Sequence, residues 1–197
     1  MAISFIEKSR RHLNRTFVSL NIRDFRFLTL SSLGMGYGQW FQMIGLPLIA
    51  YDMTGLGAQV GLITALRGGI VIVASPIGGI LSDKFNRRIV VILSSAMGAI
   101  QAGVLAAILL TGFAHVWHLY VFSLLEGFAT GINQPARIAF VRDVVDTPDL
   151  PNAVAINSIA MNGARVTGPP LAAAIYGFFG GGALFLALAV VKIMAMA

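Results

Sequence analysis

Residues 89–125 contain no Asp, Glu, Lys or Arg. As a single helix this run would be about 55 Å long, whereas the hydrocarbon core of a bilayer is about 30 Å thick. The run must therefore fold back. The segment TGFAHVWH at 111–118 is the only plausible place for the turn, because Trp117 and the two histidines suit a membrane interface. The sequence thus predicts two membrane-spanning helices in this region.

The composition indicates that lipid is the solvent for most of the chain. Hydrophobic residues make up 57% of the 197 positions and charged residues only 11%, against about a quarter charged in a soluble domain. The net charge of +6 does not indicate a nucleic-acid partner, because too little polar sequence is present to build a basic soluble surface. The chain has no cysteine, hence no disulfide framework and no thiolate metal site. We expect no cofactor and no metal.

We predict an all-α membrane protein with six crossings. The turn-rich DMTGLGAQ at 52–59 and the glycines at 180–182 separate neighbouring crossings. The last crossing would be only about 22 Å long, too short to span the bilayer, which predicts that the chain is an N-terminal fragment of a longer product. The predicted crossings are 27–51, 60–81, 89–110, 119–141, 153–179 and, incomplete, 183–197.

Basic residues set the predicted orientation. Of the 14 Lys and Arg residues, six precede the first crossing, three lie in the loop at 83–88, and Arg137 and Arg142 adjoin the loop at 142–152. By the positive-inside rule, these loops and the N-terminus are cytoplasmic.

The N-terminal segment at 1–26 is basic and amphipathic. Leu13, Phe17 and Leu20 form one helical stripe in it. Such a segment suits either the surface of an anionic leaflet or a solvated cytoplasmic tail.

The loop GGILSDKFNRR at 78–88 contains more than a topology signal requires. Its three bases are explained by orientation alone, but its glycine and acid are not. Gly79 permits close approach of two helices, and Asn86 tolerates the left-handed conformation of a tight hairpin. Asp83 can pair with a guanidinium group or with the positive end of a helix.

This loop resembles the signature between the second and third helices of the major facilitator superfamily, G-x-L-a-D-r-x-G-R-r. The matching positions are Gly79, Leu81, Asp83, Lys84, Arg87 and Arg88, and Asn86 replaces the usual glycine. The stretches at 22–28, 39–55 and 133–170 resemble an exporter branch of that superfamily, the transmembrane secretion effector or enterobactin exporter family.

The resemblance implies the N-terminal half of a twelve-helix secondary transporter in the bacterial inner membrane. It implies proton-coupled efflux of small organic molecules, drug-like or siderophore-like, by alternating access. Asp83 and Arg87 would then form a cytoplasmic latch that stabilises the outward-facing state. Gly168 and Pro169 resemble the antiporter motif of helix five, although Ala172 and Ala173 stand in place of its trailing glycines. Ser123 occupies the position of the superfamily's helix-four arginine.

Four ionisable side chains lie inside the predicted crossings: Arg67, Glu126, Arg165 and Lys192. The rise per residue of a helix places all four at about the same depth, with a formal charge of +2. One interpretation is an ion pair of Glu126 with Arg67 or Arg165 that only fixes helix packing. The other is a cavity that attracts an anionic substrate, in which Glu126 gains and loses a proton.

Polar neutral residues extend this candidate pathway. Ser158, Asn162 and Arg165 share one face of a helix, and Asn133 lies near the inner end of another. Asparagine in a membrane helix can contact substrate or can only join helices. Within GMGYG at 34–38, the glycines give a close-packing ridge rather than a phosphate loop, because the segment lies inside an apolar crossing.

The sequence bears on two further classes of function. A membrane-embedded enzyme is disfavoured, because the sequence has no H-E-x-x-H, no cysteine and no paired intramembrane aspartates. A non-transporting multi-pass subunit, or a half-transporter that needs a partner, remains the alternative. The expected partners are a small-molecule substrate, the lipid bilayer and the missing C-terminal half.

Overall fold

The computed structural model describes residues 23–144 and 150–196. Most of the amphipathic N-terminal segment and the middle of the 142–152 loop therefore lie outside the described residues. Helices account for nearly all of the described chain: α2 (Arg23–Thr54), α3 (Gly57–Lys84), α4 (Arg87–Leu110), α5 (Val116–Val144) and α6 (Leu150–Met194). The described part contains no strand, as expected for an all-α protein.

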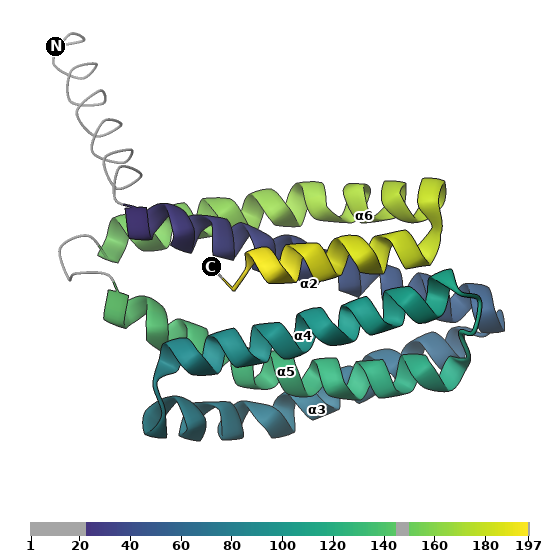
Figure 1. The fold of residues 1–197 in the computed structure, drawn as a ribbon, viewed down its shortest axis with the longest axis horizontal. Helices are drawn as coiled ribbons and strands as arrows, with labels where there is room; N and C mark the ends of the chain where they lie inside the picture. The colour runs from purple at the N-terminus through teal and green to yellow at the C-terminus, as the bar shows by residue number, and fades with distance from the viewer. Residues whose placement is uncertain (1–22, 145–149, 197) are drawn as a thin grey trace, which may run out of the picture.

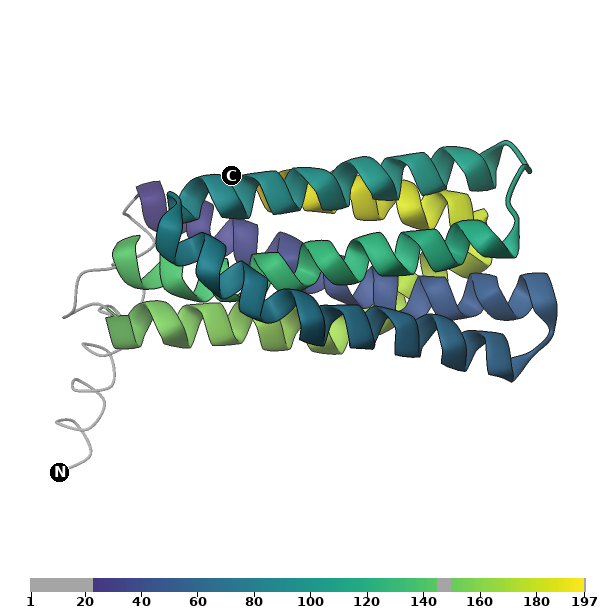
Figure 2. The ribbon, with the colours of Figure 1, turned by 90° about the horizontal axis from the view of Figure 1, so that it is seen from below.

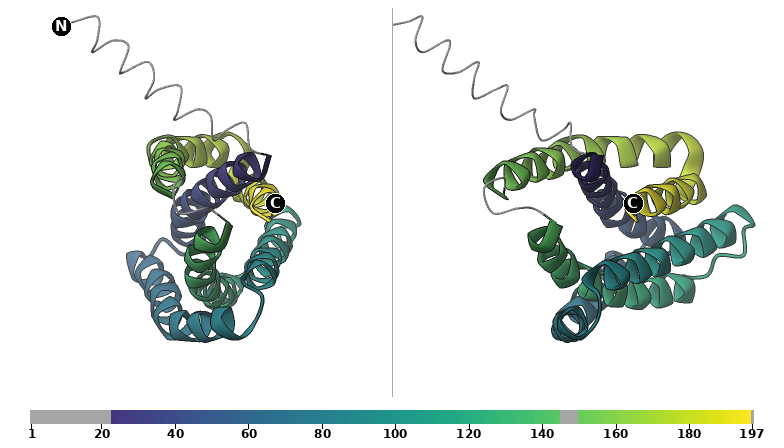
Figure 3. Two further views of the ribbon diagram at one scale, coloured as in Figure 1. Left: turned by 90° about the vertical axis from the view of Figure 1, so that its left-hand side faces the viewer. Right: turned by 60° about the vertical axis from the view of Figure 1, so that its left-hand side comes forward.

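The helices lie side by side along one long axis, and consecutive helices run in opposite directions (Figures 1 and 2). Seen from the end, α2 and α6 occupy one side of the bundle and α3 to α5 the other (Figure 3). The closest helix pairs are α2 with α6 and α3 with α5, and α4 packs on both α5 and α6. This arrangement encloses the centre of the bundle between the two groups.

The two segments predicted at 153–179 and 183–197 both lie within α6. They form two helical arms that meet at a kink at Gly180, whose φ and ψ are not helical. The chain reverses there, so that α6 consists of two arms that lie along the bundle in opposite directions (Figure 1). By length and composition, three segments of the described chain can cross a membrane: Gly57–Lys84, Arg87–Leu110 and Ser158–Met194.

Glycine makes the turns at one end of the bundle. Gly55, Gly112 and Gly180 have φ angles of +65°, +75° and +81°, and all three turns lie at the same end (Figure 1). Residues other than glycine rarely adopt this conformation. The turn predicted at 111–118 is present, between the end of α4 and the start of α5.

The turn at the opposite end, between α3 and α4, works differently from the prediction. Asn86 has a φ of −60°, and its side chain accepts a hydrogen bond from the backbone N–H of Arg88. It is therefore an N-cap of α4 and not a left-handed residue. Asparagine is favoured at this position because its side chain satisfies a backbone donor that the first turn of a helix leaves free.

Gly180 is expected to be intolerant of a side chain. Its φ and ψ of 81° and 175° lie in a region that is essentially restricted to glycine, and occupying it with another residue costs about 1 to 3 kcal/mol. We expect Gly180→Ala to lower the free energy of unfolding by about that amount, measured by denaturant titration in mixed micelles. Gly177→Ala is the matched control, because Gly177 has open space around it. Equal effects of the two substitutions would contradict the role of the φ angle.

The core combines large side chains with close backbone contacts. Phe122 of α5 packs edge-on against Phe185 of α6, with ring centroids 5.2 Å apart. A Cβ on Gly34 would lie 2.9 Å from the carbonyl oxygen of Val191, so the expected glycine ridge of α2 does bring two helices close together. This packing holds the second arm of α6 against α2. The side of that arm that carries Lys192 faces the centre of the bundle.

Candidate functional site

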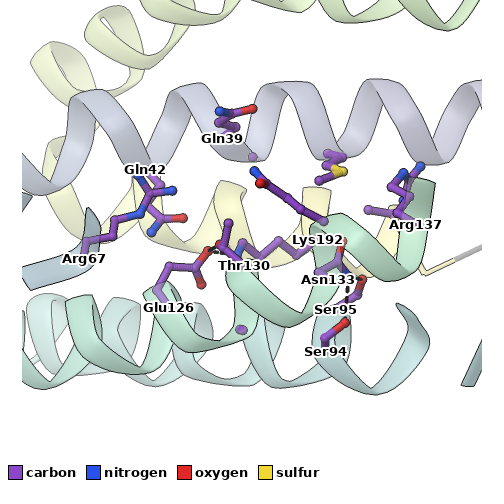
Figure 4. Close-up of a pocket in the computed structure, with 15 residues that line it drawn as sticks. Gln39, Gln42, Arg67, Ser94, Ser95, Glu126, Thr130, Asn133, Arg137 and Lys192 are labelled. Atoms are coloured by element: carbon purple, nitrogen blue, oxygen red, sulfur yellow. Dashed lines mark hydrogen bonds and ion pairs between the residues drawn. The ribbon is translucent and has the colours of Figure 1, made fainter. Parts of the chain in front are cut away.

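A polar cavity lies in the centre of the bundle, where four helices and the second arm of α6 meet (Figure 4). Half of the buried polar side chains of the described residues line it: Gln42, Ser94, Glu126, Asn133 and Arg137. Its polar lining consists of Gln39, Gln42, Arg67, Ser94, Ser95, Glu126, Thr130, Asn133, Gln134, Arg137 and Lys192.

Glu126 of α5 is the centre of a hydrogen-bond network at one end of this cavity. Its side chain is only 2% exposed, and Lys192 Nζ lies 2.6 Å from its Oε1. Thr130 Oγ1 donates to the same oxygen at 3.0 Å, and Gln101 Nε2 donates to Oε2 at 3.0 Å. A buried carboxylate needs such partners to remain charged. The ion pair joins α5 to the second arm of α6.

Gln42 of α2 extends the network to Arg67 of α3. In the amide orientation that satisfies both neighbours, its NH₂ group donates to Glu126 Oε1 at 2.8 Å and its carbonyl oxygen accepts from Arg67 Nε at 3.1 Å. This orientation is assigned from the hydrogen-bond partners. Glu126 is thus paired directly with Lys192 and only indirectly with Arg67, unlike the predicted pairing with Arg67 or Arg165.

Gly98 of α4 makes room for the ion pair. A Cβ at this position would lie 2.8 Å from Lys192 Nζ and 3.6 Å from Glu126 Oε2. The absence of a side chain there lets the lysine reach across α4 to the carboxylate. Gln101, one turn further along α4, leaves its Oε1 buried and without a hydrogen-bond partner in the described part of the chain.

Asn133 lies in the middle of the cavity and joins α5 to α4. Its Nδ2 group donates to Ser94 Oγ at 2.8 Å, to Ser95 Oγ at 3.0 Å and to the carbonyl oxygen of Val91 at 3.2 Å. Of the two roles considered for asparagine, these contacts correspond to joining helices.

Arg137 closes the other end of the cavity. It was predicted to be one of the loop bases, but its side chain is only 9% exposed. Its NH2 group donates to Ser31 Oγ at 2.9 Å and to Ser32 Oγ at 3.3 Å. The arginine is therefore held inside the bundle, between α5 and α2.

The lining of the cavity carries a net charge. Three bases and one acid line it, which gives a formal charge of +2. The described residues contain no group of three or more His, Cys, Asp or Glu side chains that could bind a metal. The arrangement can bind an anion by hydrogen bonds and charge.

The structure separates the predicted site residues into two groups. Arg67, Glu126 and Asn133 line the cavity, as does Lys192. Ser158, Asn162 and Arg165 do not, and their side chains are exposed on the first arm of α6. The rise per residue predicts only how deep Arg165 lies, and depth does not determine which way a helix face points.

The loop motif lies at the end of the bundle away from the glycine turns. Asp83 and Arg88 are exposed there, and Arg87 Nε donates to the carbonyl oxygen of Ser82 at 3.4 Å. Gly79 has open space around it and makes no close helix contact. The close approach is made instead by its neighbour Gly78, where a Cβ would lie 2.7 Å from Ile132 Cα.

The helix-five motif also has a packing role. A Cβ on Gly168 would lie 2.8 Å from Trp40 Cβ, so this glycine lets the first arm of α6 approach α2. Pro169 follows inside the same continuous helix, without a break. The predicted resemblance of this pair to a transport motif thus falls at a contact between two helices.

The sequence analysis did not single out five polar residues of the cavity lining, Gln39, Gln42, Ser94, Ser95 and Thr130, nor Gln101, which donates to Glu126. Gln42 and Gln101 are neutral, and a search for ionisable groups passes over them, although each is a glutamine within an apolar run. Arg137 was counted with the loop bases. The position of Arg137 inside the predicted crossing at 119–141 was the signal that could have identified it as a buried base.

Comparison with known proteins places this polytopic helical bundle, with its polar cavity, among membrane transporters. The Major Facilitator Superfamily matches residues 28–197. The chain is 26% identical over 152 residues to the uncharacterized MFS-type transporter YfiS of Bacillus subtilis (strain 168), covering 77% of this chain and 34% of that protein. It is 28% identical over 146 residues to the enterobactin exporter EntS of Shigella flexneri, covering 73% of this chain and 34% of that protein.

The chain therefore belongs to the Major Facilitator Superfamily, and the predicted resemblance is confirmed. Members of this family are multi-pass membrane transporters rather than enzymes. The matched stretch covers 34% of the length of each of these relatives.

Proposed function

We propose that this chain is the N-terminal part of a proton-coupled secondary transporter that exports small organic molecules by alternating access. The observation that carries the proposal is the buried Glu126–Lys192 pair inside a polar cavity lined by four helices and the second arm of α6. Ionisable groups in membrane helices are costly and line substrate or ion pathways. Exporters among the relatives support the direction of transport.

Protonation of Glu126 would change the contacts between helices. The carboxylate accepts hydrogen bonds from α2, α4, α5 and the second arm of α6. A neutral Glu126 would leave the ammonium group of Lys192 without its ion-pair partner, which weakens the link between α5 and α6. Loading and releasing one proton can therefore favour different arrangements of the same helices.

The charge distribution supports an orientation with the N-terminus in the cytoplasm of a bacterium and the protein in the inner membrane. Lys84, Arg87 and Arg88 lie at one end of the bundle, whereas the three glycine turns at the other end contain no Lys or Arg. By the positive-inside rule the basic end is cytoplasmic. The two arms of α6 would then be the fifth and sixth crossings, and Asp83 with Arg87 would form the cytoplasmic latch.

The cavity favours an anionic substrate, because its three bases exceed its one acid. Field lines concentrate in a low-dielectric cleft of one charge sign and raise the local concentration of the opposite ion. Drug-like or siderophore-like molecules with anionic groups are the substrate class that this charge fits. Enterobactin is the first probe, since relatives of this chain are named as its exporters.

Glu126→Gln tests the coupling directly. In everted membrane vesicles of the intact protein, we expect an imposed acid-inside proton gradient to drive uptake of labelled enterobactin by the wild type. The substitution keeps the shape of the side chain but removes its charge and its proton exchange, and we expect uptake to fall about a hundredfold, since proton transfer by one positioned group is worth about 10² to 10⁴ in rate.

Ser123→Ala is the matched control. Ser123 lies on the same helix, is fully buried, and its Oγ donates only within α5, to the carbonyl oxygen of Leu119. We expect this variant to keep most of the uptake. Gradient-driven uptake by Glu126→Gln at the wild-type rate would exclude the proposed role of Glu126.

A further inference from the structure

Arg137 is a buried charge without a counter-ion in the part of the chain that the structure describes. We propose that its end of the cavity is a subsite for an oxyanion group, a carboxylate or a phosphate, of a bound small molecule. The proposal names the substrate class of the transport site and in that respect rests on the proposed function, but the binding itself can be measured without transport.

The burial of Arg137 carries the first part of the argument. Its side chain is 9% exposed, and its recorded partners are the hydroxyl groups of Ser31 and Ser32. Hydroxyl groups satisfy hydrogen bonds but do not neutralise a charge. A guanidinium taken out of water is strongly unfavourable unless an anion pairs with it.

The orientation of Arg137 is fixed before any ligand binds. Ser31 Oγ donates to the carbonyl oxygen of Ala195 at 2.7 Å, so its lone pairs are available to accept from Arg137 NH2. The arginine is therefore positioned by α2 and, through the serine, by the second arm of α6. Such preorganisation lowers the entropy that a ligand loses on binding.

Donor groups of Arg137 remain available to a ligand. Its Nε and NH1 groups make no hydrogen bond among the described residues, and the side chain lines the cavity. A guanidinium presents parallel N–H groups that match two oxygens of a carboxylate or phosphate. This geometry, more than charge alone, favours an oxyanion over a halide.

The one acidic side chain of the cavity lining cannot take this role. Glu126 lies eleven residues earlier on α5, about 16 Å away along the helix, and it is already paired with Lys192. Figure 4 shows the network around Glu126 and Arg137 at opposite ends of the cavity. The two ends can therefore act as separate proton and anion subsites.

The test is anion binding by the intact purified protein in a non-ionic detergent. Inorganic phosphate and acetate are the probes, with sodium chloride at matched ionic strength, and thermal unfolding is the readout. We expect phosphate to raise the unfolding temperature of the wild type in a saturable manner. In Arg137→Gln the apparent dissociation constant should rise at least tenfold.

Arg88→Gln is the matched control, because Arg88 is exposed at the end of the bundle and the substitution removes the same charge. We expect it to change the dissociation constant less than twofold. Arg137→Lys keeps the charge but loses the planar fork, so an intermediate affinity is expected. If Arg137→Gln does not fold, this lysine variant decides: wild-type affinity in it would overturn the subsite.

Two other results would overturn the proposal. The first is the absence of any saturable effect of phosphate or acetate, or an equal effect in the Arg137 and Arg88 variants. The second concerns lipid headgroups, tested in nanodiscs of phosphatidylcholine with and without phosphatidylglycerol. If the dependence on Arg137 appears only with phosphatidylglycerol, the site binds a lipid phosphate and not a small molecule.

Wild-type binding with inactive transport would leave the subsite intact and contradict only the proposed function.

Discussion

Replacing Glu126 by alanine is expected to lower the free energy of unfolding by about 3 to 5 kcal/mol, the usual cost of removing one partner from a buried ion pair. The substitution leaves Lys192, which is 16% exposed, without a counter-ion. It also removes the acceptor for Gln101 and Thr130. Denaturant titration in mixed micelles, followed by the fluorescence of the two tryptophans, measures the change.

A double-mutant cycle separates the ion pair from the other contacts of Glu126. We expect Lys192→Ala to be destabilising alone, and the double variant with Glu126→Ala to be less destabilised than the sum, by about 1 to 3 kcal/mol. The pair Glu126→Ala and Ser123→Ala serves as a comparison, because Ser123 bonds only within α5. Additive effects of Glu126 and Lys192 would show that the 2.6 Å contact does not contribute to stability.

The search for ionisable side chains inside the predicted crossings identified Glu126, because a carboxylate is conspicuous in an apolar run. It also identified Arg67 and Lys192, which the structure places on the same cavity. The search failed to separate these from Arg165, whose side chain is exposed. Depth follows from the rise per residue, but the direction of a side chain depends on how the helix is rotated against its neighbours, and the sequence of one chain does not contain that angle.

Arg137 illustrates a different limit. Counting bases by loop is effective for topology, because the rule is a sum over many residues. The same sum conceals a single base that lies just inside the crossing. Only packing against Ser31 and Ser32 of a helix more than a hundred residues earlier shows that this arginine is buried.

The helices and turns were easier to predict from the sequence than the site was. Long apolar runs set α3 and α4, and the segment at 111–118 turns as predicted, because lipid thickness limits helix length. The break at the glycines of 180–182 was also expected, and the backbone leaves the helical conformation at Gly180, where the two arms of α6 meet. The helices also run beyond the predicted crossings, since apolar length predicts the buried part of a helix and not its ends.

The second large effect on the free energy of unfolding is expected at the two adjacent glycines, Gly78 and Gly79. A Cβ on Gly78 would lie 2.7 Å from Ile132 Cα and 2.8 Å from the carbonyl oxygen of Gly131. These are backbone atoms of α5, which cannot move aside as a flexible side chain can. We expect Gly78→Ala to lower the free energy of unfolding by about 3 kcal/mol, the upper end of the usual cost of overpacking.

Gly79→Ala is the control that the sequence itself provides. No atom lies within 4 Å of a Cβ at Gly79, so alanine there is expected to be neutral, or stabilising by up to about 1 kcal/mol through its higher helix propensity. The substitutions differ by one position and are chemically identical, so a difference between them in the same micelle titration reports the contact of α3 with α5. Equal losses at both positions would instead mean that the two helices do not meet at Gly78.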